Sequence, residues 1–185
     1  MKLSKASKIL LIASSLWYFG EGLFGPLFAI YAEKIGGDML DITWAWALYL
    51  IVTGICYVVV GKIFVNSKYK SQAMIFGYGL NAVLTFCYIF VYNTNQLYLL
   101  QIGLGIAEAL STPIWDSLFA ANLEDKENSF HWSLASGHTH FVSGIAIAIG
   151  GLIANYLSFH TLFVVMGCIQ IIATIIQSKL VFGSN

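Results

Sequence analysis

Long apolar runs separated by short polar breaks organise the chain. Six runs are mainly apolar, and each has the length of about 20 residues that an α-helix needs to cross a bilayer. The breaks are rich in charged, amide and turn-forming residues, and they are EKIGGDMLDIT, VNSKYKS, NTNQ, ANLEDKENSFH and SFH. The pattern predicts an all-α integral membrane fold, a single six-helix transmembrane domain over residues 1–185. Its spans are expected near 9–32, 44–64, 72–92, 96–120, 132–157 and 161–181.

The composition favours a chain surrounded by lipid. Apolar residues make up 58% of the sequence and charged residues 10%, against roughly 25% charged in an average soluble domain. The formal net charge is zero, so nothing indicates a nucleic-acid partner. Cys56, Cys87 and Cys168 each lie inside an apolar run, which favours buried thiols over a disulfide or a zinc site. We therefore expect a multi-pass protein of the cell (cytoplasmic) membrane, with the lipid bilayer as its surroundings.

The distribution of lysines predicts the orientation. The first apolar run follows MKLSKASK, but it is longer than the core of a signal peptide and more spans follow, so we interpret it as a membrane helix. With the N-terminus in the cytoplasm, only Lys34 lies outside. The lysines then inside are Lys2, Lys5, Lys8, Lys62, Lys68, Lys70, Lys126 and Lys179. Six spans return the C-terminus to the cytoplasm as well.

Ionisable side chains inside a membrane span are costly and usually face a cavity or a partner. Glu21 lies mid-way along the first predicted span and Glu108 mid-way along the fourth, and no lysine lies at their depth. One helical face carries Ser14, Tyr18, Glu21 and Gly25, and another carries Gln101, Gly105, Glu108, Thr112 and Asp116. These two faces predict a polar path lined by Glu21 and Glu108. For Asp116, capping or pairing near the inner interface is the alternative.

The fifth span carries two histidines and a stripe of small residues. The stripe consists of Ser133, Gly137, His140, Gly144, Ala148, Gly151 and Asn155, and small residues allow close helix contact. His138 lies outside the stripe, where it can bond a neighbouring helix. His138 and His140 are two residues apart and point to different helix faces, which makes a poor metal pair. With no nucleophile motif either, we expect no enzyme, no cofactor and no metal.

The charges that the intramembrane side chains can carry predict the kind of solute. Carboxyl groups and histidines lie in the spans, and arginine is absent from the chain. An anion would lack a basic partner there, so a cation, a proton or a neutral small molecule is favoured. Desolvation favours the neutral form of a carboxyl group, which suits proton coupling.

Several stretches resemble the major facilitator superfamily of membrane transporters. GEGLFGPLFAIYAEKIGGD (20–38) resembles its helix 1, and GLGIAEALSTPIWDSLFA (103–120) resembles its helix 4. Gly150-Gly151, after the spaced Gly144, resembles the end of its helix 5. Three positions depart from the family pattern. Val65 replaces the acid of the loop after helix 2, Leu99 replaces a helix 4 arginine, and Ala146-Ile147 replaces the Gly-Pro pair of drug–proton antiporters. Drug–proton antiport is therefore not implied.

The resemblance implies half of a transporter, because family members have two six-helix halves related by an axis along the membrane normal. In the family, helices 1 and 4 line the cavity, and helices 2 and 5 meet the other half. We expect a parallel homodimer that transports a small molecule or ion by rocker-switch alternating access. The candidate substrate- or proton-binding residues are Glu21, Glu108, Tyr18, Gln101 and Thr112; the gate or interface candidates are Asp116, His140, Gly144 and Gly151. The alternatives are a non-transporting half-domain that assembles with another membrane protein, and a fragment of a twelve-helix transporter.

Overall fold

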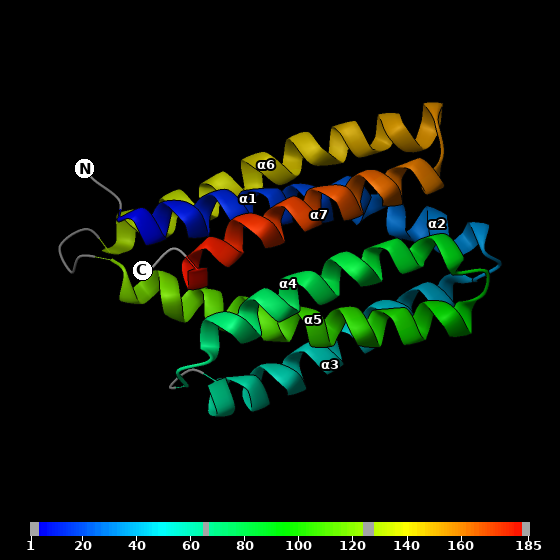
Figure 1. Ribbon diagram of the computed structural model, residues 1–185. Coiled ribbons are helices and arrows are strands. Elements are labelled where there is room, and N and C mark those ends of the chain that lie inside the picture. The colour runs from blue at the N-terminus through cyan, green and yellow to red at the C-terminus, as the bar shows by residue number, and fades with distance from the viewer. Residues whose placement is uncertain (1–3, 65–66, 124–127, 183–185) are drawn as a thin grey trace.

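The computed structural model describes residues 4–64, 67–123 and 128–182, and helices account for nearly all of them (Figure 1). Lys2, Val65 and Lys126, which entered the predictions above, lie outside the described residues. The α-helices are α1 (Lys5–Phe24), α2 (Phe28–Lys34), α3 (Met39–Phe64), α4 (Lys70–Cys87), α5 (Thr94–Ala121), α6 (Asn128–Tyr156) and α7 (Phe159–Phe182). Two short 3-10 turns, η1 (Gly25–Leu27) and η2 (Tyr88–Phe90), extend α1 and α4.

Each predicted span overlaps a helix, but the first is divided. Pro26 lies in η1, between α1 and α2, where a residue without a backbone N–H interrupts the helical hydrogen-bond ladder. Pro113 lies inside α5, which nevertheless continues to Ala121. Five helices among the described residues are long and apolar enough to cross a membrane, namely α3, α4 with η2, α5, α6 and α7. The crossing by α1, which carries Lys5, Lys8 and Glu21, stays a prediction.

Side-chain oxygens cap the first turns of several helices. Ser4 accepts a hydrogen bond from the backbone N–H of Ser7 at the start of α1, and Asn93 accepts one from that of Gln96 at the start of α5. Before α3, Asp38 and Asp41 accept hydrogen bonds from each other's backbone N–H groups. These polar residues explain why the breaks in the hydropathy pattern lie where they do.

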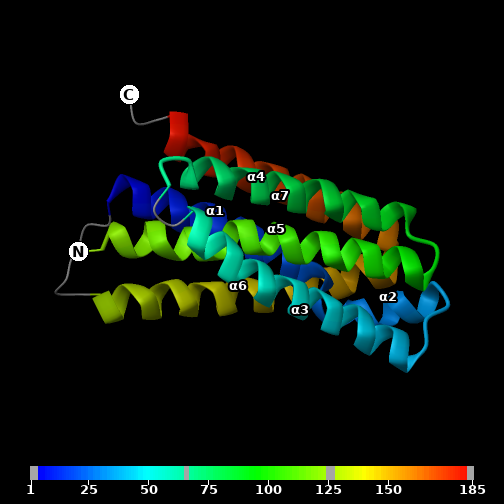
Figure 2. The same ribbon diagram turned by 90° about the horizontal axis from the view of Figure 1, so that it is seen from below.

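The helices form two groups of three. In one group α1 packs against α6 and α7, and in the other α5 packs against α3 and α4. The contact between α4 and α7 joins the groups, and these two helices lie side by side in both views (Figures 1 and 2). Each group therefore takes its central helix from one half of the chain and its two flanking helices from the other half. This exchange places α1 and α5 in the interior of the molecule.

Both ends of the described chain lie at the same end of the bundle (Figure 1). This end holds the start of α1, the end of α3, the start of α4 and the end of α7. These helix ends, with the turn before α4, carry Lys5, Lys8, Lys62, Lys68, Lys70 and Lys179, whereas Lys34 ends α2 at the opposite end. The described lysines other than Lys34 therefore lie at one end of the bundle, as the predicted orientation requires. That this end faces the cytoplasm stays a prediction.

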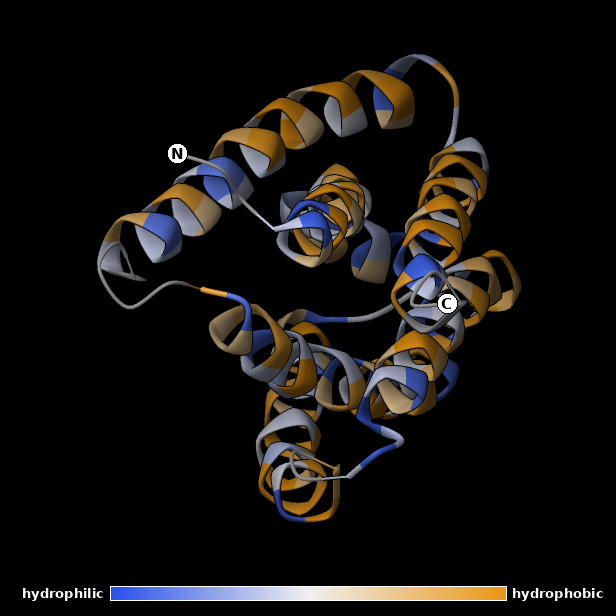
Figure 3. Ribbon diagram, turned by 60° about the vertical axis from the view of Figure 1, so that its left-hand side comes forward, coloured by the Kyte–Doolittle hydropathy of each residue, from blue (hydrophilic) through white to orange (hydrophobic). Residues whose placement is uncertain are grey.

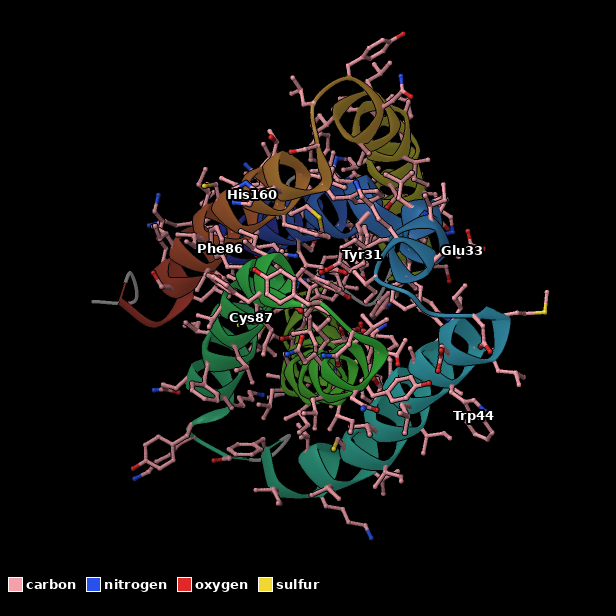
Figure 4. The ribbon with its side chains drawn as sticks, turned by 90° about the vertical axis from the view of Figure 1, so that its right-hand side faces the viewer. Tyr31, Glu33, Trp44, Phe86, Cys87 and His160 are labelled. Atoms are coloured by element: carbon pink, nitrogen blue, oxygen red, sulfur yellow. The ribbon has the colours of Figure 1, made fainter. Side chains whose placement is uncertain are left out.

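Aromatic packing closes the opposite end of the bundle. The Tyr31 hydroxyl donates hydrogen bonds to the backbone carbonyls of Tyr88 (2.7 Å) and Val91 (3.2 Å). Phe24 packs edge-to-face against Tyr88 and Phe163, with ring centroids 5.0 and 5.1 Å away. Figure 4 shows Tyr31 among the helices of this end and Trp44 pointing away from them. The cluster joins α1, α2, η2 and α7.

The flanking helices leave wide apolar faces uncovered. The buried residues of α3 are Ala45, Thr53 and Val60, which share one narrow face. Apolar side chains such as Leu50, Ile55 and Val59 are exposed on the same helix. Figure 3, coloured by hydropathy, shows that the long helices are mostly hydrophobic along their length. In water such faces would be costly, whereas lipid or another apolar protein surface covers them without cost.

The face of α6 that packs inside the chain differs from the predicted stripe. A Cβ atom on Gly150 would lie 1.8 Å from the Leu23 carbonyl oxygen, so α1 approaches α6 there too closely for any side chain. Gly137, Gly144 and Gly151 have nothing within 4 Å of such a Cβ position. These three glycines therefore make no close helix contact inside the chain, and the place of Gly144 and Gly151 at an interface between copies stays a prediction. Every α-helix has several faces, and packing against α1 selected the one with Gly150.

Candidate functional site

A cavity of about 350 Å³ lies between α1 and α5, the two interior helices. Helices α1 and α5 together supply eight of its fifteen lining residues, and the others come from η1, α2, α3, α4, η2 and α6. The lining residues are Trp17, Tyr18, Glu21, Gly22, Phe24, Gly25, Phe28, Trp46, Tyr49, Asn81, Tyr88, Gln101, Leu104, Glu108 and Ser143. The volume lies within the range of small-molecule sites, roughly 300–1,000 Å³.

Glu21 reaches this cavity from α1 and is held by two amide groups. Its Oε1 atom accepts hydrogen bonds from Asn81 Nδ2 (2.8 Å) on α4 and from Gln170 Nε2 (2.7 Å) on α7. Both amide side chains are buried, whereas Glu21 is exposed because its side chain lines the cavity. Gly20 makes room for the amide of α7, since a Cβ atom there would lie 3.1 Å from Gln170 Cγ.

Glu108 reaches the same cavity from α5 and is held by two hydroxyl groups. Its Oε1 atom accepts hydrogen bonds from the Tyr57 hydroxyl (3.0 Å) on α3 and from Thr112 Oγ1 (2.6 Å), one turn further along α5. The helical spacing of four residues brings Thr112 beneath Glu108. The glutamates thus share one cavity but have partners of different chemistry.

The lining carries negative charge and aromatic rings. Among the described lining residues, the groups that can carry a full charge near neutral pH are the carboxylates of Glu21 and Glu108. No lysine or histidine is among them, and the chain has no arginine. Seven lining residues are aromatic: Trp17, Tyr18, Phe24, Phe28, Trp46, Tyr49 and Tyr88. Such a site attracts positive charge through the carboxylates and through the negative faces of the rings.

The structure brings most predicted binding residues together. Tyr18, Glu21, Gln101 and Glu108 line the cavity, and Thr112 contacts it through its hydrogen bond to Glu108. Gly105 instead packs against α3, where a Cβ atom would lie 2.9 Å from the Tyr49 carbonyl oxygen.

The predicted gate and interface residues lie elsewhere. Asp116, His140, Gly144 and Gly151 do not line this cavity, and the first three are exposed. His140 Nδ1 lies 2.8 Å from the carbonyl oxygen of Ser136 within α6. His138 Nδ1 lies 3.0 Å from Ser15 Oγ of α1, which confirms that it bonds a neighbouring helix.

Sequence reasoning missed the residues that hold the two carboxylates. Tyr57, Asn81 and Gln170 each lie on a different helix from their partner glutamate. Asn81 and Gln170 did carry a signal, because an amide in the middle of an apolar span needs a polar partner. The identity of that partner depends on how the helices pack, which a periodicity argument does not contain.

The described parts of the chain hold no group of three or more His, Cys, Asp or Glu residues that could bind a metal ion. The chemistry available in the cavity is therefore that of carboxyl, hydroxyl and amide groups beside aromatic rings.

Comparison with known proteins agrees with this architecture. The sequence profile of the Major Facilitator Superfamily matches residues 10–183. The chain belongs to the major facilitator superfamily. It is 25% identical over 190 aligned positions to the "Uncharacterized MFS-type transporter MJ1560" of Methanocaldococcus jannaschii, an alignment that covers 100% of this chain and 48% of that protein. This superfamily chain thus spans about half the length of the curated relative that it matches, and it is a multi-pass membrane protein of a transporter family.

Proposed function

We propose that the chain is a secondary active transporter of a small cationic or neutral solute, coupled to protons, that works as a parallel homodimer. The observation that carries the proposal is the cavity between α1 and α5, lined by Glu21 and Glu108 and free of basic residues among its described lining. Family membership supports transport, and the cavity supports the kind of solute.

The two glutamates are the proposed proton or cation groups. A carboxyl group inside a membrane protein can take up and release a proton, because its protonated form is neutral and is compatible with a low dielectric. A carboxyl group paired with a lysine or arginine would do so less readily. Tyr18, Gln101 and Thr112 are the proposed polar contacts around them. Asp116 lies about two turns further along α5, towards the lysine-rich end, and is the proposed gate residue.

The proposed homodimer is supported by the position of α3 and α6 beside this site. Trp46 of α3 and Ser143 of α6 line the cavity, so both of these helices border it. The exposed apolar faces of α3 and α6 are available to a second copy, which would close the cavity and add its own carboxylates. In this arrangement His140, Gly144 and Gly151 lie at the interface, and the copies rock against each other in alternating access.

A second candidate is a half-domain that assembles with a different membrane protein. The coverage of only 48% of the curated relative favours this candidate as much as it favours a homodimer. It predicts that the purified chain alone neither transports nor forms a dimer.

Transport by the purified chain tests the proposal. Proteoliposomes with an imposed pH gradient are given labelled tetraethylammonium, benzyltrimethylammonium or a neutral sugar, and internal pH is followed with a trapped dye. We expect solute movement coupled to proton movement in the wild type and its loss in Glu21→Gln and Glu108→Gln. Glu33→Gln is the matched control, because Glu33 is exposed near the end of α2, outside the cavity lining (Figure 4). Wild-type coupled transport in both cavity variants would show the carboxylate assignment to be wrong.

A further inference from the structure

A second hollow of the molecule lies between α1 and α6, outside the central cavity. We propose that this groove binds one anionic phospholipid, with an acyl chain lying in the groove and the headgroup against Lys5 and Lys8. The groove and the central cavity share no lining residue. The proposal therefore goes beyond the transport proposed above and does not depend on it.

The groove has the size and the surface that a hydrocarbon chain requires. Its volume is about 410 Å³, within the range of small-molecule sites, roughly 300–1,000 Å³. Apolar side chains provide most of its surface, and the six lining residues include no acid. The lining consists of Leu11, Ile12, Ser15 and Leu16 from α1 and Leu134 and His138 from α6. Water would solvate such a surface poorly, whereas an acyl chain covers it.

The two polar residues of the lining are bonded to each other. The Ser15 hydroxyl donates to the Leu11 carbonyl of its own helix, so Ser15 Oγ accepts from His138 Nδ1, 3.0 Å away. This hydrogen bond joins α1 to α6 beside the groove and helps to set the spacing of its two walls. The remaining contacts available to a ligand are mainly those of leucine and isoleucine side chains.

The groove opens away from the central cavity. Ser143 of α6 lines the cavity, and Leu134 lies about two and a half helical turns before it, on the opposite side of the helix. Although α1 is an interior helix, Ile12 in the groove is 55% exposed, so the groove is open to the surroundings. A second copy that closed the cavity would therefore leave the groove facing lipid.

Positive charge lies at one end of this apolar groove. Lys8 precedes Ile12 by about one turn and Ser15 by about two turns, which places it on the groove face of α1. Lys5 lies about one turn further towards the lysine-rich end (Figure 1), and both lysines are exposed. A lysine has a flexible apolar stem, so its ammonium group can extend to the depth of the headgroups.

The combination of the two features identifies the ligand. A soluble anion would use the lysines but not the apolar groove, and an uncharged lipid would use the groove but not the lysines. Anionic phospholipids carry both an acyl chain and a net negative headgroup, and lysines near the membrane surface attract them. The charge and the apolar surface therefore match one class of molecule, which the surrounding bilayer supplies.

Lipid retention in mild detergent tests the role of the lysines. The protein is mixed with dioleoyl phosphatidylglycerol or with dioleoyl phosphatidylcholine, which have the same chains, and native mass measurement gives the affinity for the first lipid retained. We expect the wild type to bind the anionic lipid at least about tenfold more tightly. The double variant Lys5→Gln with Lys8→Gln should lose this preference. Lys68→Gln with Lys70→Gln is the matched control, because it removes the same charge at the same end of the bundle, outside the groove.

Filling the groove tests the role of its apolar walls. Leu134→Trp places a large ring in the groove and should weaken binding of the anionic lipid at least about tenfold. Leu152→Trp is the matched control, because Leu152 is exposed on the same face of α6, about five turns away. Both leucines are exposed, so thermal unfolding without added lipid should be the same in both variants as in the wild type. Glycerophosphoglycerol, the headgroup without chains, should not compete.

Several results would overturn the proposal. They are equal affinity of the wild type for the two lipids, equal effects of the two lysine pairs, equal effects of the two tryptophan variants, and competition by glycerophosphoglycerol. Conversion of a dimer to a monomer by Leu134→Trp, with lipid affinity unchanged, would show instead that a second copy covers the groove. Lipid binding is measured without a solute gradient, so the proposal stands or fails whether or not the chain transports.

Discussion

Gln170 and Gln177 are two buried glutamines on the same helix, and they differ in what their amides contact. Gln170 Nε2 donates to Glu21, whereas Gln177 Nε2 lies 3.3 Å from the Met74 sulfur, a weak acceptor. The Oε1 atoms of both are buried without a hydrogen-bond partner. A buried polar group of this kind is costly, so it persists where it serves another group. For Gln170 that group is the cavity carboxylate.

Replacing each glutamine by methionine tests this difference. Gln170→Met leaves Glu21 with one donor fewer, and we expect it to destabilise the fold by about 1–3 kcal/mol and to weaken cation binding. Gln177→Met is the matched control, because it replaces a poorly satisfied amide with an apolar side chain of similar length and should be neutral or stabilising. Thermal unfolding in detergent measures both effects. Equal destabilisation by the two variants would contradict a specific role for Gln170.

At the scale of elements, the close approach of α1 and α6 depends on small residues. Gly22 faces α6, where a Cβ atom would lie 2.9 Å from Ala146 Cβ, and Gly150 faces the backbone of Leu23. The fit is far tighter than ordinary van der Waals contact, and helices in membranes associate mainly by such packing. This contact holds α6 against the helix that carries Glu21.

Neighbouring glycines of α6 give a matched pair for this contact. Gly150→Ala must push α1 and α6 apart, and overpacking of this kind costs about 1–3 kcal/mol. Gly151→Ala adds the same methyl group where nothing lies within 4 Å, so it should leave the stability of the single chain unchanged. Unfolding of both variants in detergent is compared with the wild type. A stable Gly150→Ala variant would mean that α1 and α6 pack less closely than the structure shows.

At the scale of the whole molecule, the uncovered faces of α3 and α6 determine how the chain associates with lipid or with other protein. Large apolar side chains are exposed along both helices, among them Ile51, Ile55, Phe141 and Leu152. These faces border the helices that line the cavity, and lipid could cover them as well as protein could. The association state is therefore the property that separates a homodimer from a half-domain with another partner.

Native mass measurement in mild detergent tests the homodimer. The wild type should run at twice the chain mass of 20.4 kDa. Gly144→Leu and Gly151→Leu place bulk on the open face of α6 and should shift the protein towards monomer by at least about tenfold in the association constant. Cys168→Leu is the control, because Cys168 is exposed on α7. A strictly monomeric wild type, or a dimer unaffected by both α6 variants, would contradict the proposed interface.

The sequence alone determined the class of the molecule and the position of its helices. Transfer of each residue from water to lipid is a local quantity, and its sum over about 20 residues marks a span whatever the neighbours are. The same reasoning placed Glu21 and Glu108 mid-way along their predicted spans, because helical rise is constant. It also identified the residues on the polar faces of α1 and α5, because the helical period determines which positions share a face.

Only the tertiary structure decided what those groups contact. The first span is broken at Pro26 while α5 passes through Pro113, and only the surroundings of each proline distinguish them. The face of α6 that is packed, like the choice of amides that donate to Glu21, depends on which helices are neighbours in the fold. Lipid and protein interior are almost equally apolar, so hydropathy carries little information about that choice. Close packing and hydrogen-bond satisfaction make it, and they act between residues as distant in the chain as Glu21 and Gln170.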